Sequence, residues 1–336
     1  MSVRTSTQQP TSYTPTLSPN SKSIHERRLL HFFALHRMAT ATNILNALPE
    51  HFLYHNKVIR HLNWLCNKGY LIRQEDGDEY VYNITPLGYE RCKDKEIGVD
   101  LAMVPYTYET PTGKRSKHEI LITNTATSLY QCVSQGLPVQ ILKEWRFCLH
   151  NISVADPDTG EQLYPFANKY PDYMYLAKDS NGLMLRMLEA VHGVEAASDL
   201  KQMIREYELW EQTKAAQLFL TQLYSRFGAK EPKIEFQIHC ILESSSWKHT
   251  DAHKERMTMM QTFQVSPKTQ GRVWTTTKDA IETALGEGLS INVPIWHRGK
   301  DLMGEKRQRW QMAGKGMRTK LIDNFMRTLP TYPLFV

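Results

Sequence analysis

The sequence predicts a two-part α+β protein, in which a small helical unit ending in a β-hairpin precedes a larger mixed α/β domain. Two observations support this fold class. Near the N-terminus three short helical patterns precede two strand patterns around a tight turn, whereas from residue 117 onward helical and strand patterns alternate. With 336 residues, 41% of them hydrophobic and 23% charged, the chain is long enough for two or three domains that bury cores of their own.

Composition limits the classes of partner and compartment. The 41 Lys and Arg outnumber the 35 Asp and Glu and give a formal net charge of +6, which suits a polyanion such as DNA, although proteins with neutral ligands can be as basic. No apolar run approaches the ~18 residues of a membrane span, and the N-terminus lacks the apolar core of a secretory signal. We therefore expect a cytoplasmic protein with no membrane partner.

The first part of the chain is expected to begin with a tail and two helices. Residues 1–22 are rich in Ser, Thr, Pro and Gln and are interpreted as a flexible tail, because they cannot support a packed core. Order is expected from Ser23, with an apolar helix that also carries Arg and His residues. Thr40 or Thr42 could cap a second short helix, since a hydroxyl satisfies one of the free amides of a first helical turn.

A third helix and a hairpin complete this first unit, which we assign to residues 23–92. Residues 54–67 show helical periodicity, and Gly69 is a natural C-cap because glycine readily adopts positive φ. Two short strand patterns then flank the Asp-Gly-Asp turn at residues 76–78. Three helices followed by a hairpin is the order of a winged helix-turn-helix, and the segment "NKGYLIRQEDGDEYVYNITPLGYE" resembles bacterial winged-helix regulators.

In such a unit the third helix lies in the DNA major groove, so its exposed residues are the leading candidates for base or phosphate contacts. A basic residue at the base of the wing could also reach a phosphate. The candidates are Asn56, Lys57, Arg60, His61 and Arg73. Winged helices can also dock proteins, and Lys or Arg on a helix is usually a solvated face, so a protein-docking role stays open.

Beyond a polar linker at residues 93–116, a larger α/β domain is expected over residues 117–295. Its predicted elements alternate between helix and strand. They are a helix at 117–135, strands at 139–147, 173–177 and 183–190, a helix from about 196 to 224, and a strand at 233–242.

Two carboxylates stand at the ends of neighbouring predicted strands. In "YPFANKYPDYMYLA" Asp172 directly precedes one strand, and Glu189 lies near the end of the next, which a tight turn joins to the first. This arrangement can bring both carboxylates together. Such hard oxygen ligands suit Mg²⁺ or Mn²⁺, which could polarise a scissile phosphate and activate water. In the alternative interpretation Asp172 is simply a turn or cap residue.

The carboxylate pair resembles the restriction-endonuclease-like PD-(D/E)xK core, with Asp172 and Glu189 as the match. Val191 stands where that pattern has its lysine, and Lys201 on the next helix is the candidate for a lysine that has moved. Together with the first unit, the segments "KHEILITNTATSLY" and "PDYMYLA…LRMLEAVHGVEAASDLKQMIREYELW" resemble the replication-relaxation family of bacterial mobile elements. This family includes the MobC-type plasmid relaxases, and the resemblance covers roughly residues 23–210.

The resemblance implies a catalytic set of acidic residues and one lysine, with the first two members of the set as ligands of Mg²⁺ or Mn²⁺. The set is Asp172, Glu189, Glu195, Lys201 and Glu119. It also implies a protein of a plasmid or integrative element that nicks double-stranded DNA, with other mobilisation or replication proteins as partners. Without the resemblance, Glu195 is interpreted as a negative charge at the positive end of the following helix dipole, and Lys201 as part of a solvated helix face.

A non-catalytic alternative also stays open. The chain could be a DNA-binding regulator, or a replication or assembly factor, that keeps a degenerate nuclease fold as a platform. Val191 favours this alternative, because the nuclease pattern has a functional side chain at that position. A homodimer is compatible with either function.

The last part of the chain, residues 296–336, is the most basic and is treated as a separate segment. Its sequence "RGKDLMGEKRQRWQMAGKGMRTK" interleaves basic residues and glycines with Trp310, which fits a surface that follows a nucleic-acid backbone. Arg307 and Arg309 are its candidate DNA contacts. A basic loop without such a task is the equal alternative.

Overall fold

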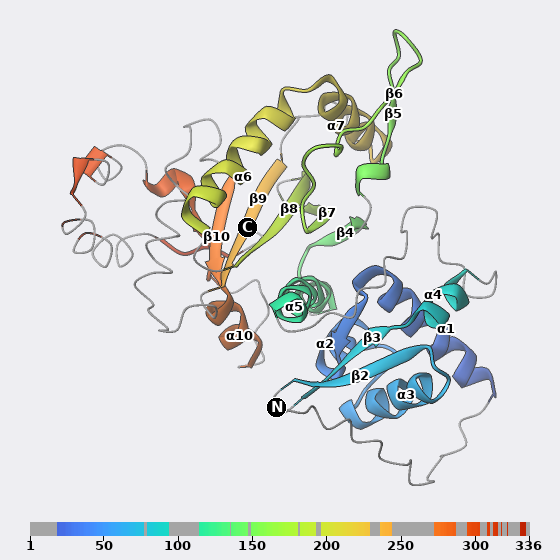
Figure 1. Ribbon diagram of the computed structural model, residues 1–336. Helices are drawn as coiled ribbons and strands as arrows, with labels where there is room; N and C mark the ends of the chain where they lie inside the picture. Colours follow the sequence, from blue (N-terminus) through green and yellow to red (C-terminus); the bar gives the residue numbers. More distant parts are fainter. Residues whose placement is uncertain are drawn as a thin grey trace, which may run out of the picture.

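In the computed structural model two folded parts are joined by a shared helix (Figure 1). The described residues are 19–76, 79–93, 114–134, 136–146, 149–180, 182–192, 196–228, 236–243, 272–286, 294–302, 308–309, 312–314, 317, 321 and 330–333. Within them no helix is long and apolar enough to cross a membrane.

The first part packs four helices around a small antiparallel sheet. Its elements are α1 (Pro19–His36), β1 (Met38–Thr40), α2 (Ala41–Ala47), α3 (His55–Asn67), β2 (Leu71–Asp76), β3 (Glu79–Ile84) and α4 (Pro86–Cys92). The strand order is β1-β3-β2. The predicted third helix and hairpin are therefore present, and β1, which no pattern in the sequence indicated, adds a third strand. Buried apolar side chains of all four helices and the strands form one core.

Local signals set the ends of these elements. Thr40 caps α2, because its side chain accepts a hydrogen bond from the Asn43 N–H at 3.2 Å, while the Asn43 side chain accepts one from the Thr40 N–H at 2.9 Å. Of the two predicted caps Thr40 is thus the correct one, and the Thr42 hydroxyl instead donates to Glu79 at 2.9 Å. Gly69, with φ of +74°, follows α3 as expected.

The second part contains a six-stranded mixed sheet of order β11-β10-β9-β8-β7-β4. Its main elements are α5 (Lys114–Ser134), β4 (Gln140–Trp145), β7 (Tyr173–Asp179), β8 (Gly182–His192), α6 (Ala196–Glu211), α7 (Lys214–Arg226), β9 (Phe236–Glu243), β10 (Val273–Thr277), α10 (Lys278–Gly286) and β11 (His297–Arg298). Neighbours β8, β9 and β10 run parallel, and the other pairs are antiparallel. A small hairpin, β5 (Val154–Ala155) and β6 (Gln162–Leu163), and two 3₁₀ turns (Leu149–Asn151 and Gly299–Leu302) complete it. The chain is therefore a mixed α/β protein, as the sequence predicts.

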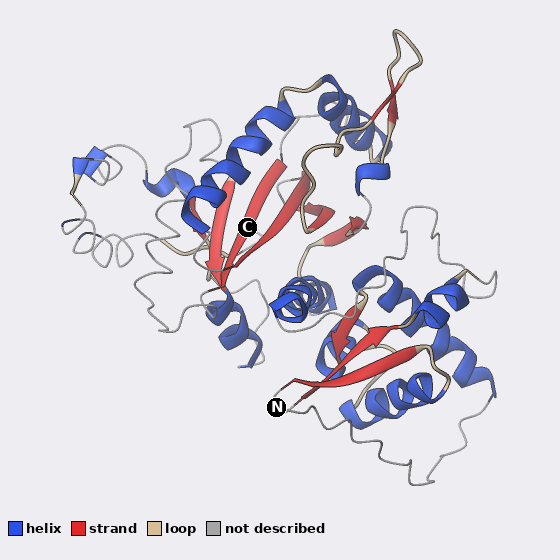
Figure 2. Ribbon diagram, in the orientation of Figure 1, coloured by secondary structure: helices blue, strands red, loops and turns tan. Residues whose placement is uncertain are grey.

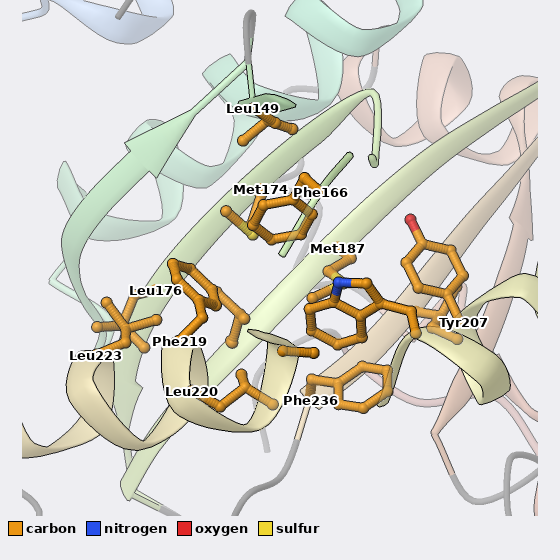
Figure 3. Packing of buried hydrophobic residues seen from close by; sticks show 14 of the residues in the cluster. Leu149, Phe166, Met174, Leu176, Met187, Tyr207, Phe219, Leu220, Leu223 and Phe236 are labelled. Atoms are coloured by element: carbon orange, nitrogen blue, oxygen red, sulfur yellow. The ribbon is translucent and has the colours of Figure 1, made fainter. Parts of the chain in front are cut away.

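Helices cover both faces of this sheet (Figure 2). Because side chains alternate along a strand, β7 supplies two cores. Met174 and Leu176 join the cluster beneath α6 and α7, part of which Figure 3 shows, whereas Tyr173 and Tyr175 join the cluster beneath α5 and α10. The strand is buried on both sides, which explains its continuous apolar sequence.

Two expectations for this part need correction. The predicted helix from about 196 to 224 is two helices, because Thr213 caps α7 by accepting a hydrogen bond from the Ala216 N–H at 3.2 Å. The segment after residue 295 is also not separate from the sheet. Its strand β11 pairs with β10, and Trp296 forms an isolated bridge with Tyr332.

Helix α5 packs against both parts of the molecule. Toward the first part, the Asn43 side chain of α2 donates to the Asn124 side chain at 2.7 Å, and the Thr123 hydroxyl donates to the Met38 carbonyl at 2.9 Å. Toward the second part, α5 contributes apolar side chains to the core beneath the six-stranded sheet. The two parts are therefore connected through one helix rather than by a linker alone.

Candidate active site

Strand pairing brings Asp172 and Glu189 to one edge of the mixed sheet. The antiparallel register of β7 and β8 pairs Tyr173 with Leu188, so the next step outward sets Asp172 opposite Glu189. The Asp172 carboxylate also accepts a hydrogen bond from the Ala190 N–H at 2.8 Å. This backbone contact fixes the Asp172 side chain beside β8, so the two carboxylates lie together.

Glu189 is 6% exposed and is held by two donors. Lys169 Nζ lies 2.8 Å from Glu189 Oε1 and 4.0 Å from Glu206 Oε2. The Tyr207 hydroxyl of α6 donates to Glu189 Oε1 at 2.5 Å, and the Lys169 ammonium lies 4.9 Å from the centre of the Tyr207 ring. In Figure 3 Tyr207 lies at the edge of the apolar cluster. A lysine and a tyrosine thus hold one oxygen of the buried carboxylate.

Asp172 receives its main charged contact from the other side of the sheet. His118 of α5 places Nε2 at 3.3 Å from Asp172 Oδ1. Burial alone would raise the pKa of Asp172, but the hydrogen bond and charge of His118, with the Ala190 N–H, outweigh it and hold that pKa below its ordinary value. Burial likewise opposes protonation of His118, yet its hydrogen bond to Asp172 leaves the His118 pKa raised. The two groups therefore favour an ion pair.

The two carboxylates titrate differently. Burial, followed by the negative charge of Asp172, raises the pKa of Glu189 to about 7, and this rise remains although Lys169 and Tyr207 favour the charged form. Near neutral pH the site therefore holds one ionised carboxylate beside one that can gain or lose a proton.

The donor set fits a hard divalent cation. Within the described residues, no group of three or more His, Cys, Asp or Glu is arranged to hold a metal. Mg²⁺ needs fewer protein ligands, because it binds through one or two carboxylates and keeps several waters. Burial and then the negative charge of Asp172 raise the pKa of Glu189, and a cation held by both carboxylates would offset both effects.

The other residues expected at this site lie elsewhere or outside the described residues. Glu119 is bound to Arg146, whose Nη2 lies 2.8 Å from Glu119 Oε2, so this carboxylate serves a buried ion pair and not the carboxylate site. Lys201 belongs to α6, but its side chain is outside the described residues, as are Glu195 and the side chain of Val191.

Lys169 is the lysine that sequence reasoning missed. It lies three residues before Asp172 in "NKYPDY", and the loop that positions Asp172 also carries Lys169 to Glu189. The nuclease pattern places its lysine after the glutamate, so spacing alone gave no reason to choose Lys169. Its position in the same loop as Asp172 was the one available signal.

The candidate DNA contacts are only partly exposed. Asn56 and Arg60 are exposed on α3, and Arg73 is exposed on β2, where its guanidinium donates to the Asn63 side chain at 3.2 Å. Lys57 is half-buried, and its ammonium donates to the His51 carbonyl at 3.0 Å. Arg309 is exposed, and Arg307 lies outside the described residues.

His61 is not an exposed contact, contrary to expectation. It is 1% exposed, and its ring lies 4.5 Å from the His25 ring and 5.5 Å from the Phe52 ring, measured between centres. The reason is helical periodicity. His61 follows Val58 by three positions and therefore shares the buried face of α3.

Comparison of the chain with models of protein families, with curated proteins and with solved structures gave no match. The fold and the site define a class by themselves. This is a mixed α/β protein whose sheet carries a carboxylate pair with an adjacent lysine.

Proposed function

We propose that the chain is a sequence-specific DNA-binding protein of a plasmid or integrative element that nicks DNA in a metal-dependent reaction. The convergence of Asp172, Glu189 and Lys169 at one sheet edge carries this proposal. Two acidic residues and a lysine on neighbouring strands are the site of the restriction-endonuclease-like PD-(D/E)xK core. Apart from the inserted β5–β6 hairpin, the order α5-β4-β7-β8-α6-α7-β9, with two antiparallel strand pairs followed by a parallel one, supports that likeness. The resemblance of the sequence to the replication-relaxation family is the second basis of the proposal.

The first part of the chain supports recognition of DNA. Helices α1, α2 and α3 with β1 and the β2–β3 hairpin, followed by α4, fit a winged helix-turn-helix, in which α3 would enter the major groove. Asn56 and Arg60 are exposed on α3, and the contact of Arg73 with Asn63 places that guanidinium beside the same helix. The net charge of +6 favours association with a polyanion.

Each side chain of the site has a distinct task in the proposed reaction. Asp172 and Glu189 would hold Mg²⁺ or Mn²⁺, which when bound supplies Lewis-acid polarisation of the phosphate and a more acidic water. Lys169 stabilises negative charge on the phosphate as the bond to the leaving oxygen breaks. His118, which does not face the phosphate in this scheme, orients Asp172 through their contact of 3.3 Å.

Cleavage of supercoiled plasmid tests the proposal. The plasmid carries the DNA upstream of the protein's own gene, and Mn²⁺ or Mg²⁺ is added to wild type, Asp172→Asn and Glu189→Gln. We expect open circles from wild type and from neither of these two variants, because both substitutions remove a metal ligand while keeping side-chain size. Glu144→Gln is the matched control, since Glu144 is a buried carboxylate on the same sheet that binds Tyr130 and Tyr173. Intact plasmid with wild type in both metals contradicts the proposal.

One observation favours the non-catalytic alternative. Lys169 and Tyr207 already occupy one oxygen of Glu189, and Val191 stands where the nuclease pattern has its lysine. A regulator or a replication or assembly factor would bind DNA equally well with and without metal, and Asp172→Asn would leave its gel shift unchanged. Intact plasmid together with a retained gel shift would favour this function.

A further inference from the structure

A cleft of about 330 Å³ lies beside the carboxylate site. The loop at residues 164–169 forms one wall, and the end of α6 with the start of α7 forms the other. Its main lining residues are Tyr164, Pro165, Lys169, Glu206, Leu209 and Trp210. Since Lys169 also contacts Glu189, one end of the cleft adjoins the proposed site of cleavage.

The walls of the cleft are held in place by buried contacts. Trp210 is 4% exposed, and its indole N–H donates to the Pro165 carbonyl at 2.7 Å. The Trp210 ring stacks on Phe166, with ring centres 5.5 Å apart and planes 21° apart. These contacts tie the loop to α6, so a ligand would meet a cleft that is already formed.

The lining combines apolar and charged side chains. At the rim Tyr164 is 51% exposed and Leu209 is 64% exposed, so an aromatic ring and an aliphatic side chain are open to solvent. The Lys169 ammonium and the Glu206 carboxylate, 4.0 Å apart, also line the cleft. The exposed Tyr164 ring suits stacking by a flat ring, and the Lys169 ammonium, which Glu189 and Glu206 also contact, is the lining group that can meet an attached phosphate.

We propose that this cleft binds one unpaired nucleotide of the DNA substrate, with its base against Tyr164 and its phosphate toward Lys169. The inference rests on the proposed function and deepens it. The volume is at the low end of the roughly 300–1,000 Å³ of small-ligand clefts, which suits a single nucleotide and not a duplex. A paired base cannot enter, so the substrate is DNA with an unpaired strand at the site. Stacking on an aromatic ring tolerates every base, so the cleft recognises unpairing and not base identity.

The test measures binding without cleavage. Fluorescence anisotropy in EDTA compares a labelled dT hexanucleotide with a labelled hexamer of abasic deoxyribose phosphate, which has the same charge and lacks bases. We expect wild type to bind the dT hexamer at least about fivefold more tightly, the lower end of what one stacked base contributes. Tyr164→Ala should remove that preference and leave the abasic affinity unchanged.

Two matched pairs of variants separate the cleft from general effects on the surface. Tyr170→Ala removes a tyrosine of similar exposure, 57%, from a neighbouring position that does not line the cleft, and should preserve the preference for bases. Ala215→Leu fills the cleft and should abolish the preference for bases. Gln222→Leu adds the same side chain at an exposed position of α7 and should preserve that preference. Melting temperatures show that each variant is folded.

The outcomes for the cleft and for the nicking activity are distinct. Equal affinity of wild type for the two hexamers, or an equal loss of both affinities in Tyr164→Ala, overturns the nucleotide cleft even if the protein nicks plasmid. A preference for bases that depends on Tyr164 supports the nucleotide cleft. If the same protein leaves plasmid intact, it binds unpaired DNA without cleaving it, and the proposed nuclease activity is overturned.

Discussion

Asp172 and Glu189 carry the same functional group in unlike surroundings. His118 and a backbone N–H favour the charged form of Asp172, whereas burial and the charge of Asp172 raise the pKa of Glu189 to about 7. Pairs of carboxyl groups whose pKa values are pushed apart are typical of sites that combine a permanent charge with proton exchange. Lys169, followed by the Tyr207 hydroxyl, limits this rise in the pKa of Glu189.

Replacing Lys169 tests its role at the single-residue level. Lys169→Met keeps the length of the side chain and removes its charge, so we expect plasmid nicking to slow by at least about 100-fold while the gel shift persists. Lys214→Met is the control, because Lys214 also joins two carboxylates, those of Asp156 and Asp158, at 2.7 and 3.0 Å. Equal nicking rates for Lys169→Met and wild type would show that the ammonium only neutralises Glu189.

The buried His61 makes stability depend on pH. Burial, with the nearby charges of His25, Lys57 and Arg60, lowers the His61 pKa from 6.5 to about 4. Between these values the unfolded chain binds a proton that the folded chain does not, so stability is complete above pH 6.5 and falls as the pH drops toward 4. The loss due to His61 is at most on the order of 3 kcal/mol.

Urea midpoints at several pH values between 7 and 4 measure this effect. His61→Gln should reduce the pH dependence, because glutamine does not titrate, while His36 and His239, whose pKa values burial also lowers, continue to contribute. His150→Gln, at an exposed histidine, should keep the wild-type dependence. An unchanged slope in His61→Gln would assign the pH dependence to other groups.

At the scale of elements, the start of α4 depends on a close backbone contact. The Thr85 side chain accepts a hydrogen bond from the Gly88 N–H at 3.0 Å and donates one to the Gly69 carbonyl at 2.6 Å, which joins α4 to the end of α3. A Cβ at Gly88 would lie 2.1 Å from the Tyr70 carbonyl oxygen. Position 88 therefore has room only for glycine. The sequence pattern alone did not reveal this requirement.

We expect Gly88→Ala to destabilise the protein by about 1–3 kcal/mol, the usual cost of forcing atoms into a packed site. Thermal or urea unfolding measures the change. Gly314→Ala is the control, since a Cβ there meets nothing within 4 Å. Equal stability of the two variants would mean that α4 can shift away from Tyr70 without cost.

At the scale of the whole molecule, α5 links the carboxylate site to the first part of the chain. His118 contacts Asp172, and the next residue, Glu119, binds the buried guanidinium of Arg146. Arg146 also contacts His36 Nδ1 and the Thr123 hydroxyl at 3.0 and 2.9 Å. The buried guanidinium of Arg146 thus joins α1 and α5 to the end of β4.

Removing the Arg146 guanidinium should lower the unfolding free energy of the protein. Arg146→Met leaves Glu119 without its partner, and breaking a buried pair from one side costs about 3–5 kcal/mol. The double variant Arg146→Met/Glu119→Gln should be less destabilised than the sum of the two single variants, because it leaves no unpaired charge. Unfolding free energies of the four proteins measure the coupling, and strict additivity would show that the pair does not interact.

The elements that sequence predicted well are those with local signals. The hairpin follows from its Asp-Gly-Asp turn, α2 from its threonine cap, and β7 and β8 from apolar runs around a turn. The pairing of Asp172 with Glu189 also follows locally, because a tight turn fixes the register of the two strands. For such features the determining residues lie within a few positions of each other.

The tertiary structure alone decided what depends on distant residues. The folded loop brings Lys169 to Glu189, and Arg146, 27 residues from Glu119 in the sequence, binds that carboxylate and so excludes it from the predicted catalytic set. The contact of Arg146 with His36 spans 110 residues. The sequence by itself determined the local elements and the carboxylate pair, whereas packing between separate elements determined which charged groups meet, because burial and partner choice arise from contacts that no local pattern encodes.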